Sequence, residues 1–304
     1  MTYEAFLEKV RSEISSRFED NYEVHIQQFP KNNGIVYDGL SIFNPECNLT
    51  PTIYLNPYYH WYLNGVSMEE ICENIIETYH ERNPQKDFDT SFFTDYGKAK
   101  SNIIAKLINC EKNQELLQRV PHFKFLDLAV VFQCMVNSCE DGVATILIHN
   151  HHLDFWNVTQ DELYTVALEN TSRLFPYQME NMEKMLKDSM PMLPQEMQFQ
   201  SCPLYILTNE MKLNGASVIL YPKLIKKVAD EFHSDFVLLP SSIHEWLLIP
   251  AESPENISMF SQMVMEVNDT QLSDEEKLSD HAYYYSRNMD MIFVNADDIK
   301  QLEL

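Results

Sequence analysis

Glycine is scarce in this chain, and its scarcity excludes several kinds of ligand site. Only six glycines occur among 304 residues, and none are spaced as G-x-G-x-x-G or G-x-x-x-x-G-K-[ST]. Such loops need glycine because backbone amides must approach phosphate groups closely. The G-x-S-x-G, H-E-x-x-H and protein-kinase motifs are missing too. We therefore expect no standard dinucleotide or P-loop site, and we assign no cofactor.

Long hydrophobic runs are also absent. No apolar stretch approaches the ~20 residues that a bilayer-spanning helix needs. The first six residues, Met1 to Phe6, contain no basic residue and no extended apolar segment of the kind that opens a secretory signal. We expect no membrane association, no secretion and a cytoplasmic location.

Cysteines are few and scattered. The six are Cys47, Cys72, Cys110, Cys134, Cys139 and Cys202, and no pair is spaced as C-x-x-C. Several have apolar neighbours, which is typical of buried thiols in a reducing compartment. Reduced thiols are the simpler interpretation, although the even number leaves a disulfide framework formally possible.

Basic residues are outnumbered, with 22 Lys and Arg against 46 Asp and Glu and a net charge of -24. This field repels phosphate backbones, so we expect no nucleic-acid binding. The segment from Glu252 to Leu304 alone holds twelve acidic and three basic residues, a balance of 3 minus 12, or -9. It is interpreted either as a solvated face or as a docking surface for a basic protein partner.

Hydrophobic periodicity predicts an α+β fold with mainly antiparallel sheets and packed helices. In the first half it predicts helices over 6–18, 67–83, from 103 onward and 159–176, hairpins over 22–43 and 123–149, and a strand at 52–55. In the second half it predicts strands at 204–208, 217–220, 236–239, 246–249, 282–285 and 291–294, with helices at 222–232 and 254–267. A Met- and Pro-rich stretch suggests two lobes, 1–178 and 201–304, joined by a linker at 179–200.

The strongest local candidate for chemistry is Leu239-Pro-Ser-Ser-Ile-His-Glu-Trp246. There Ser242, His244 and Glu245 offer a nucleophile, a base and an orienting carboxylate, provided that the fold brings them together. The alternative is structural, because Ser242 and Glu245 have the spacing of a capping box that opens one helical turn.

Four further residues are candidate ligand contacts. Asn209 and Asn214 lie in Leu207-Thr-Asn209 and Asn214-Gly-Ala216, which join two expected strands, and Ser241 and Asp280 could complete a small-ligand site. Asn and Gly are also the residues that tight turns require, so a turn remains the alternative.

The histidines of His149-Asn-His-His-Leu-Asp154 are candidate metal ligands. His149 and His151 would share a side of an extended strand, and Asp154 could add a third donor. A polar strand end is the simpler interpretation because no second ligand cluster exists, so no metal site is predicted.

Several strings together resemble an uncharacterised family of hypothetical bacterial proteins, frequent in gut anaerobes and classed as a domain of unknown function. The strings are Asp38-Gly-Leu-Ser-Ile42, Pro51-Thr-Ile-Tyr-Leu-Asn56, Glu169-Asn-Thr171, the two Asn motifs, the Ser241–Glu245 string, and Leu278-Ser-Asp280 with Tyr283-Tyr-Tyr285. The resemblance covers nearly the whole chain. It implies a bacterial, cytoplasmic protein and brings no activity with it.

Two functions follow as hypotheses, and the sequence does not decide whether the chain is an enzyme. The leading one is a non-catalytic interaction or regulatory protein with an acidic surface. The rival is an enzyme, such as a hydrolase, or a small-ligand binder that uses the Ser241–Glu245 turn. An acidic mimic of nucleic acid is a third idea. The oligomeric state is not defined by the sequence.

Overall fold

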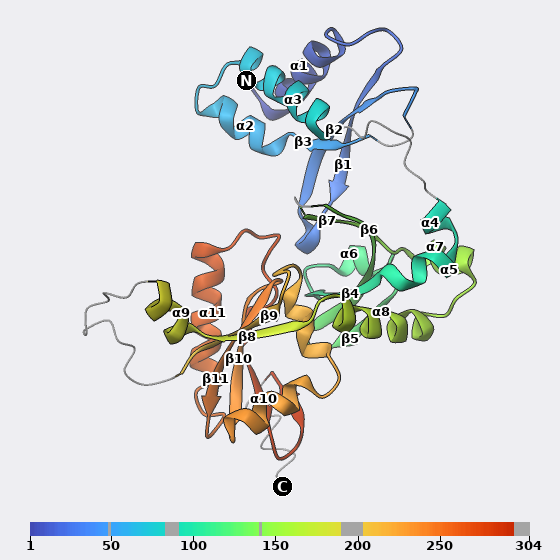
Figure 1. Cartoon of the computed structure of the whole chain (residues 1–304). Helices are drawn as coiled ribbons and strands as arrows, with labels where there is room; N and C mark the ends of the chain where they lie inside the picture. Colours follow the sequence, from blue (N-terminus) through green and yellow to red (C-terminus); the bar gives the residue numbers. More distant parts are fainter. Residues whose placement is uncertain (48–49, 83–90, 140–141, 190–202, 295–304) are drawn as a thin grey trace. The chain divides into compact units, whose positions relative to one another are not determined.

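The computed structural model describes residues 1–304 except 48–49, 83–90, 140–141, 190–202 and 295–304 (Figure 1). Within the described residues the chain forms eleven α-helices and thirteen strands, arranged in three antiparallel sheets. The α+β class expected from the sequence is confirmed. Contacts divide the chain into two compact units, Met1–Ser91 and Phe92–Leu304.

The first unit packs helices against a small antiparallel sheet of order β1-β2-β3. Thr2 caps the first helix by accepting a hydrogen bond from the N–H of Ala5 at 3.3 Å, and the helix buries Phe6, Val10 and Ile14. The expected hairpin, the Ser67-capped helix and the strand after Pro51 are all confirmed. The elements are α1 (Tyr3–Ser15), β1 (Glu23–Pro30), η1 (Asn32–Gly34), β2 (Val36–Phe43), β3 (Thr52–Tyr54), α2 (Asn56–Leu63) and α3 (Met68–Arg82).

The second unit begins with short helices and a four-stranded sheet in which β6 pairs with β4, β5 and β7. One face of this sheet packs on α8 and the other face on α6. The elements are α4 (Ser91–Thr94), α5 (Tyr96–Ala99), η2 (Lys100–Asn102), β4 (Ile103–Asn109), α6 (Gln114–Leu117), β5 (His122–Phe125), β6 (Leu128–Cys139), β7 (Gly142–Leu147), α7 (Asn150–Trp156) and α8 (Gln160–Leu174).

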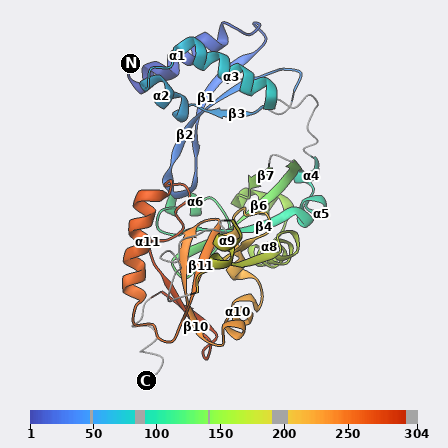
Figure 2. The same cartoon turned by 60° about the vertical axis from the view of Figure 1, so that its left-hand side comes forward.

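A six-stranded antiparallel sheet follows, in the order β13-β12-β10-β11-β9-β8. Alternate residues of β10 point to its two faces: Phe236 and Leu238 join the core that contains α10, whereas Val237 and Leu239 pack beneath α11. Figure 2 shows α11 and α10 on opposite sides of these strands. The elements are β8 (Tyr177–Asn181), α9 (Met182–Ser189), β9 (Tyr205–Asn209), η4 (Gly215–Leu220), α10 (Leu224–Phe232), β10 (Asp235–Ser242), β11 (Glu245–Ala251), α11 (Ile257–Gln271), β12 (Tyr283–Ser286) and β13 (Met291–Phe293).

Two side-chain hydroxyl groups accept hydrogen bonds from the edge of β4 that does not pair with β6. Its backbone N–H groups at Ala105 and Leu107 donate to Thr171 Oγ1 at 2.8 Å and to Ser217 Oγ at 3.2 Å. Thr171 lies in α8 and Ser217 in η4, so one helix and one 3-10 turn lie along this strand.

The two compact units differ from the two lobes expected from the sequence. One buried cluster of the second unit combines residues before 179 with residues after 200, and β8 pairs with β9 across the expected linker. Much of that linker, 190–200, lies outside the described residues. The contacts therefore place the division near residue 91.

Two expected elements were wrong. The helix expected from 103 onward is the strand β4, because Ile103, Ile104, Leu107 and Ile108 are buried on both faces of a sheet and fit either period. The strand expected at 217–220 is part of the 3-10 helix η4, which turns after Gly215. No helix in the described parts of the chain combines the length and the apolar character needed to cross a bilayer.

Candidate functional site

The Ser241–Glu245 string forms the tight turn of the β10–β11 hairpin. Ser242 pairs with Glu245 across the hairpin, so Ile243 and His244 are the two turn residues. Ser242 Oγ accepts a hydrogen bond from the N–H of His244 at 3.0 Å, and Ser241 Oγ donates to Glu245 Oε1 at 3.0 Å. The expected helical turn capped by Ser242 is therefore wrong: the chain reverses direction instead, because the two flanking strands pair.

The imidazole of His244 faces the loop between β9 and η4. Its Nδ1 accepts a hydrogen bond from the N–H of Asn214 at 3.0 Å, which assigns the ring proton to Nε2. Burial lowers the pKa of His244 below its ordinary value. A neutral ring suits this position, because a protonated Nδ1 could not accept from a backbone amide.

The backbone of the His244 turn is held by its neighbours. Thr208 Oγ1 donates to the carbonyl oxygen of His244 at 2.7 Å. Gly215 lies so close that a Cβ placed there would stand 2.1 Å from Thr208 Oγ1 and 2.2 Å from the oxygen of His244. Glycine is required at this position by the close approach, since any side chain would push the two loops apart.

Asn209 and Asn214 shape the same loop. The side chain of Asn209, 1% exposed, donates to the oxygen of Leu213 at 2.8 Å and accepts from its N–H at 3.2 Å. Asn214 takes the left-handed conformation with φ 49° and donates to Gln133 Oε1 at 3.4 Å. The Asn209 side chain thus holds the backbone of Leu213, whereas the Asn214 side chain contacts the side chain of Gln133.

The structure brings Ser242, His244 and Glu245 into one turn but does not join them as a relay. The Ser242 hydroxyl contacts a backbone amide, the Glu245 carboxylate contacts Ser241, and the His244 ring contacts Asn214. A nucleophilic hydroxyl needs its general base within hydrogen-bond reach. Within the described residues these polar groups stabilise the turn.

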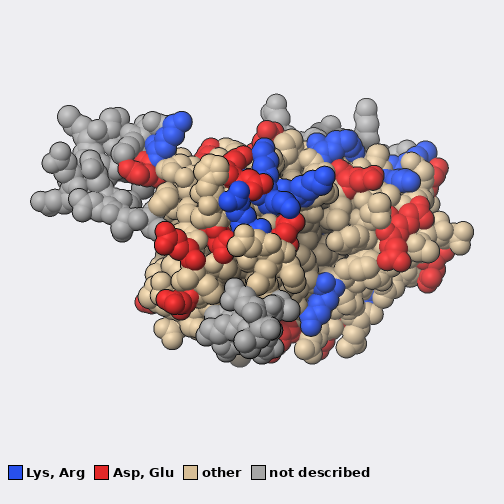
Figure 3. Space-filling model, turned by 90° about the horizontal axis from the view of Figure 1, so that it is seen from below, with Lys and Arg blue, Asp and Glu red and all other residues tan. Residues whose placement is uncertain are grey.

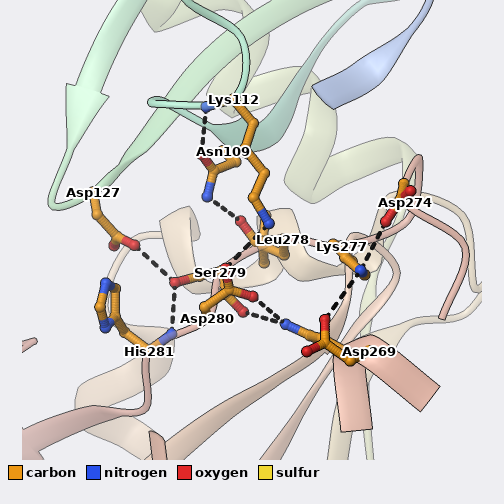
Figure 4. A network of polar contacts seen from close by, with 11 residues as sticks. Asn109, Lys112, Asp127, Asp269, Asp274, Lys277, Leu278, Ser279, Asp280 and His281 are labelled. Carbon is orange, nitrogen blue, oxygen red and sulfur yellow. Dashed lines mark hydrogen bonds and ion pairs between the residues drawn. The ribbon is translucent and has the colours of Figure 1, made fainter. Parts of the chain in front are cut away.

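Asp280 belongs to a different network, shown in Figure 4. Its carboxylate pairs with Lys112 Nζ at 3.1 Å and accepts from Asn268 Nδ2 at 2.7 Å. Burial alone would raise the pKa of Asp280, but the hydrogen bonds from Asn268 and Lys112 outweigh it and lower the pKa. The carboxylate therefore stays ionised and links α11 to the turn after β4.

The residues around Asp280 extend this network. Ser279 Oγ donates to Asp127 Oδ2 at 2.7 Å, and Asn109 Nδ2 donates to the oxygen of Leu278 at 3.1 Å (Figure 4). Lys277 bridges Asp274 at 2.7 Å and Asp269 at 3.5 Å. No hydrogen bond or ion pair in the described residues connects Asp280 with Ser242, His244 or Glu245.

The histidines after β7 cap a helix. The N–H of His149 donates to Nδ1 of His152 in the first turn of α7, and His151 and Asp154 are exposed. Burial lowers the pKa of His152 to about 4, and the neighbouring histidines contribute. Among the residues that the structure describes, no group of three His, Cys, Asp or Glu is arranged to hold a metal ion.

Helix α11 carries a surface that the sequence interpretation missed. Its inner side buries Ile257, Val264 and Asn268, whereas its outer side exposes Met259, Met263 and Val267 by 53%, 48% and 44%. Positions i, i+4 and i+8 form one line along a helix. We call this line the α11 strip. The same spacing is visible in the sequence, but only the burial of the opposite face shows that these apolar residues point outward.

The sequence matches the family described as "Family of unknown function (DUF5688)" over residues 3–287. The chain belongs to this family. No curated protein and no solved structure matches it. Membership covers both compact units and agrees with the resemblance drawn from the sequence strings.

Proposed function

We propose that this member of DUF5688 is a non-catalytic interaction protein, and that the α11 strip binds a basic amphipathic helix of another protein. The observation that carries the proposal is the line of exposed apolar side chains on a helix whose other face is fixed in the core. Single exposed apolar residues are ordinary, but an aligned group marks a contact surface.

The chemistry of the strip suits an exchangeable helical partner. Methionine is unbranched and polarizable, so it adapts to apolar side chains of different shapes. A partner helix with apolar residues at i, i+3 or i+4 and i+7 would lay them along Met259, Met263 and Val267. The strip would therefore recognise the apolar face of a helix, and its binding would depend little on the exact sequence of that helix.

The acidic residues around the strip favour a partner of positive charge. Residues 252–276, which include α11, contain seven Asp and Glu and no Lys or Arg. Glu255 lies just before the helix and Glu266 within it, and both are exposed, whereas Asp269 already pairs with Lys277 at 3.5 Å. The basic side chains of a partner helix would be attracted to these carboxylates. A second copy of this chain would instead bring its own carboxylates close to them, and the two sets would repel each other.

We also propose that the protein acts in the bacterial cytoplasm. Cys72 and Cys134 are buried thiols outside any disulfide, and burial raises the pKa of Cys134 to about 11, so its thiol stays protonated. Fractionation of the source cells with an antibody against the chain tests this, and recovery in a secreted fraction would contradict it.

The binding experiment uses a synthetic Leu/Lys helix of about 20 residues and a scrambled peptide of the same composition. We expect the amphipathic peptide to bind the full chain at least about tenfold more tightly than the scrambled one, measured by fluorescence anisotropy. Replacing Met259 and Met263 by Gln together should weaken binding by at least about tenfold, because each buried Met side chain contributes about 1.5–3 kcal/mol.

Two matched variants separate apolar contact from charge. Met211→Gln changes a methionine that is 54% exposed outside α11, and it should leave binding unchanged. Glu266→Gln should weaken binding mainly at low salt. Equal affinity for both peptides would overturn the proposal. A dimer in sedimentation that the Met259 and Met263 double variant abolishes would also overturn it, since the strip would then bind a second copy.

A further inference from the structure

A cavity of about 440 Å³, widely open to solvent, lies beside the start of α10, within the second unit. It is lined by residues of β5, the turn after it, η4, α10 and the β12–β13 hairpin. Its volume falls within the ~300–1,000 Å³ usual for small-molecule sites. Figure 3 shows Lys and Arg side chains, with Asp and Glu side chains among them, on the face seen from below. The cavity does not involve α11, so this inference is independent of the proposed function.

Three lysines border this cavity in a chain whose net charge is -24. Lys124 and Lys223 make no ion pair with any residue that the structure describes, and Lys226 lies 3.4 Å from Asp290. Asp290 is the one acidic residue among those that line this cavity, and Asp230 and Glu231 share the adjoining hollow with Lys223, Lys226 and Lys227. This local excess of positive charge would attract an anion despite the acidic surface elsewhere.

The start of α10 adds backbone donors to the same place. Lys223 is its N-cap in the left-handed conformation, with φ 64°, and no side chain caps the first turn. The N–H of Leu224 already donates to the oxygen of Tyr221 at 3.1 Å. The next first-turn N–H groups, those of Ile225 and Lys226, lack acceptors within their own helix and favour a phosphate. The cavity reaches Ile225 and Lys226 of this turn.

The remaining walls are apolar. Phe125 and Ile292, both half-buried, line the cavity together with Ile219 and Tyr285, which are buried. The hydroxyl of Tyr285 donates to Asp290. Aromatic and branched side chains of this kind pack against a flat ring. A bare inorganic anion would leave this apolar area without contacts, whereas a ring joined to a phosphate would use both parts of the cavity.

We propose that the cavity binds a mononucleotide, with its phosphate at Lys124, Lys223 and the first turn of α10 and its base against the apolar walls. The experiment titrates the full chain with AMP, adenosine and inorganic phosphate in separate calorimetric runs. We expect AMP to bind at least about tenfold more tightly than either fragment, because only AMP meets both halves of the site.

Lysine variants test whether AMP binds at this cavity. Lys124→Gln with Lys223→Gln should weaken AMP binding by at least about tenfold, because two charge-assisted contacts are lost. Lys9→Gln with Lys184→Gln removes the same charge from exposed positions outside the cavity and should leave affinity unchanged. Each single lysine variant is measured as well, so that a failure of the double variant to fold does not decide the result.

Three results would overturn the proposal. The first is no AMP binding at millimolar concentration. The second is equal affinity for AMP and one of its fragments, which would show that only a ring or only an anion is recognised. The third is the same affinity in both double variants, which would place AMP elsewhere on the chain.

Discussion

The β10–β11 turn and the cavity beside α10 are both rich in polar side chains, yet they use them differently. In the turn, Ser242, His244 and Asn209 each contact a backbone group of the protein. At the cavity, Lys124 and Lys223 are among the lining residues and have no ion pair among the described residues. Polar groups that satisfy one another stabilise the fold, whereas charges held beside a cavity without partners remain available to a ligand.

The comparison predicts that substitutions in the turn change stability and that substitutions at the cavity do not. Chemical denaturation at neutral pH tests both. Four substitutions should have successively smaller effects on stability.

Gly215→Ala should lower the free energy of unfolding by about 3 kcal/mol. The added Cβ would stand 2.1 Å from Thr208 Oγ1 and 2.2 Å from the oxygen of His244, so the two loops must separate. Gly97→Ala is the matched control, because its Cβ meets only a side-chain oxygen of Asp95 at 3.1 Å. A similar loss in both variants would show that the loops are not interlocked.

Asn209→Ala should cost about 2 kcal/mol, because the N–H and oxygen of the Leu213 backbone lose their partner in a buried place. Urea denaturation measures it. Asn150→Ala, which removes one exposed hydrogen bond to the oxygen of Gln118, should cost less than about 1 kcal/mol. Equal losses would indicate that the Asn209 loop has no special role in stability.

Acidification should weaken the fold through His244. Its pKa in the folded chain lies below the ordinary 6.5 because the ring is buried. The unfolded chain therefore binds more protons, and the free energy of unfolding falls as the pH decreases below that value. His244→Gln should reduce this fall between about pH 7.5 and about pH 5. Part of the fall in the free energy of unfolding should remain in this variant, because the pKa values of His149 and His152 are also lowered. An unchanged pH dependence would contradict the assignment.

Lys223→Met should change the free energy of unfolding by less than about 0.5 kcal/mol, since its ammonium group makes no ion pair with a described residue. The same denaturation curves measure it. A loss above about 1 kcal/mol would mean that Lys223 stabilises the fold, and the contrast between turn and cavity would fail.

Local patterns predicted much of the fold. The hairpin over 22–43 has a turn at Lys31-Asn-Asn-Gly34 between β-rich runs, and Ser67 and Thr159 cap their helices as their spacing indicated. These features depend on neighbours in sequence, so the sequence contains them. The strand β4 was missed because a strand buried on both faces has the same apolar density as a buried helix.

The candidate sites depended on distant contacts. Nothing in Ser241 to Glu245 shows that Asn214, thirty residues away in the chain, donates to the His244 ring. The cavity brings Lys124 together with Lys223 and Lys226, and no sequence pattern connects Lys124 with the other two. Asp280 was expected near the turn, but Asn268 and Lys112 hold it in another network.

The hydroxyl contacts along β4 close the free edge of this strand inside the protein. A strand with a neighbour on only one side offers a row of unused amides to any other chain, which is a common route to aggregation. Here Thr171 and Ser217 already occupy the amides of Ala105 and Leu107. Valine at Thr171 would leave the buried N–H of Ala105 without its acceptor and should lower the free energy of unfolding by about 1–3 kcal/mol.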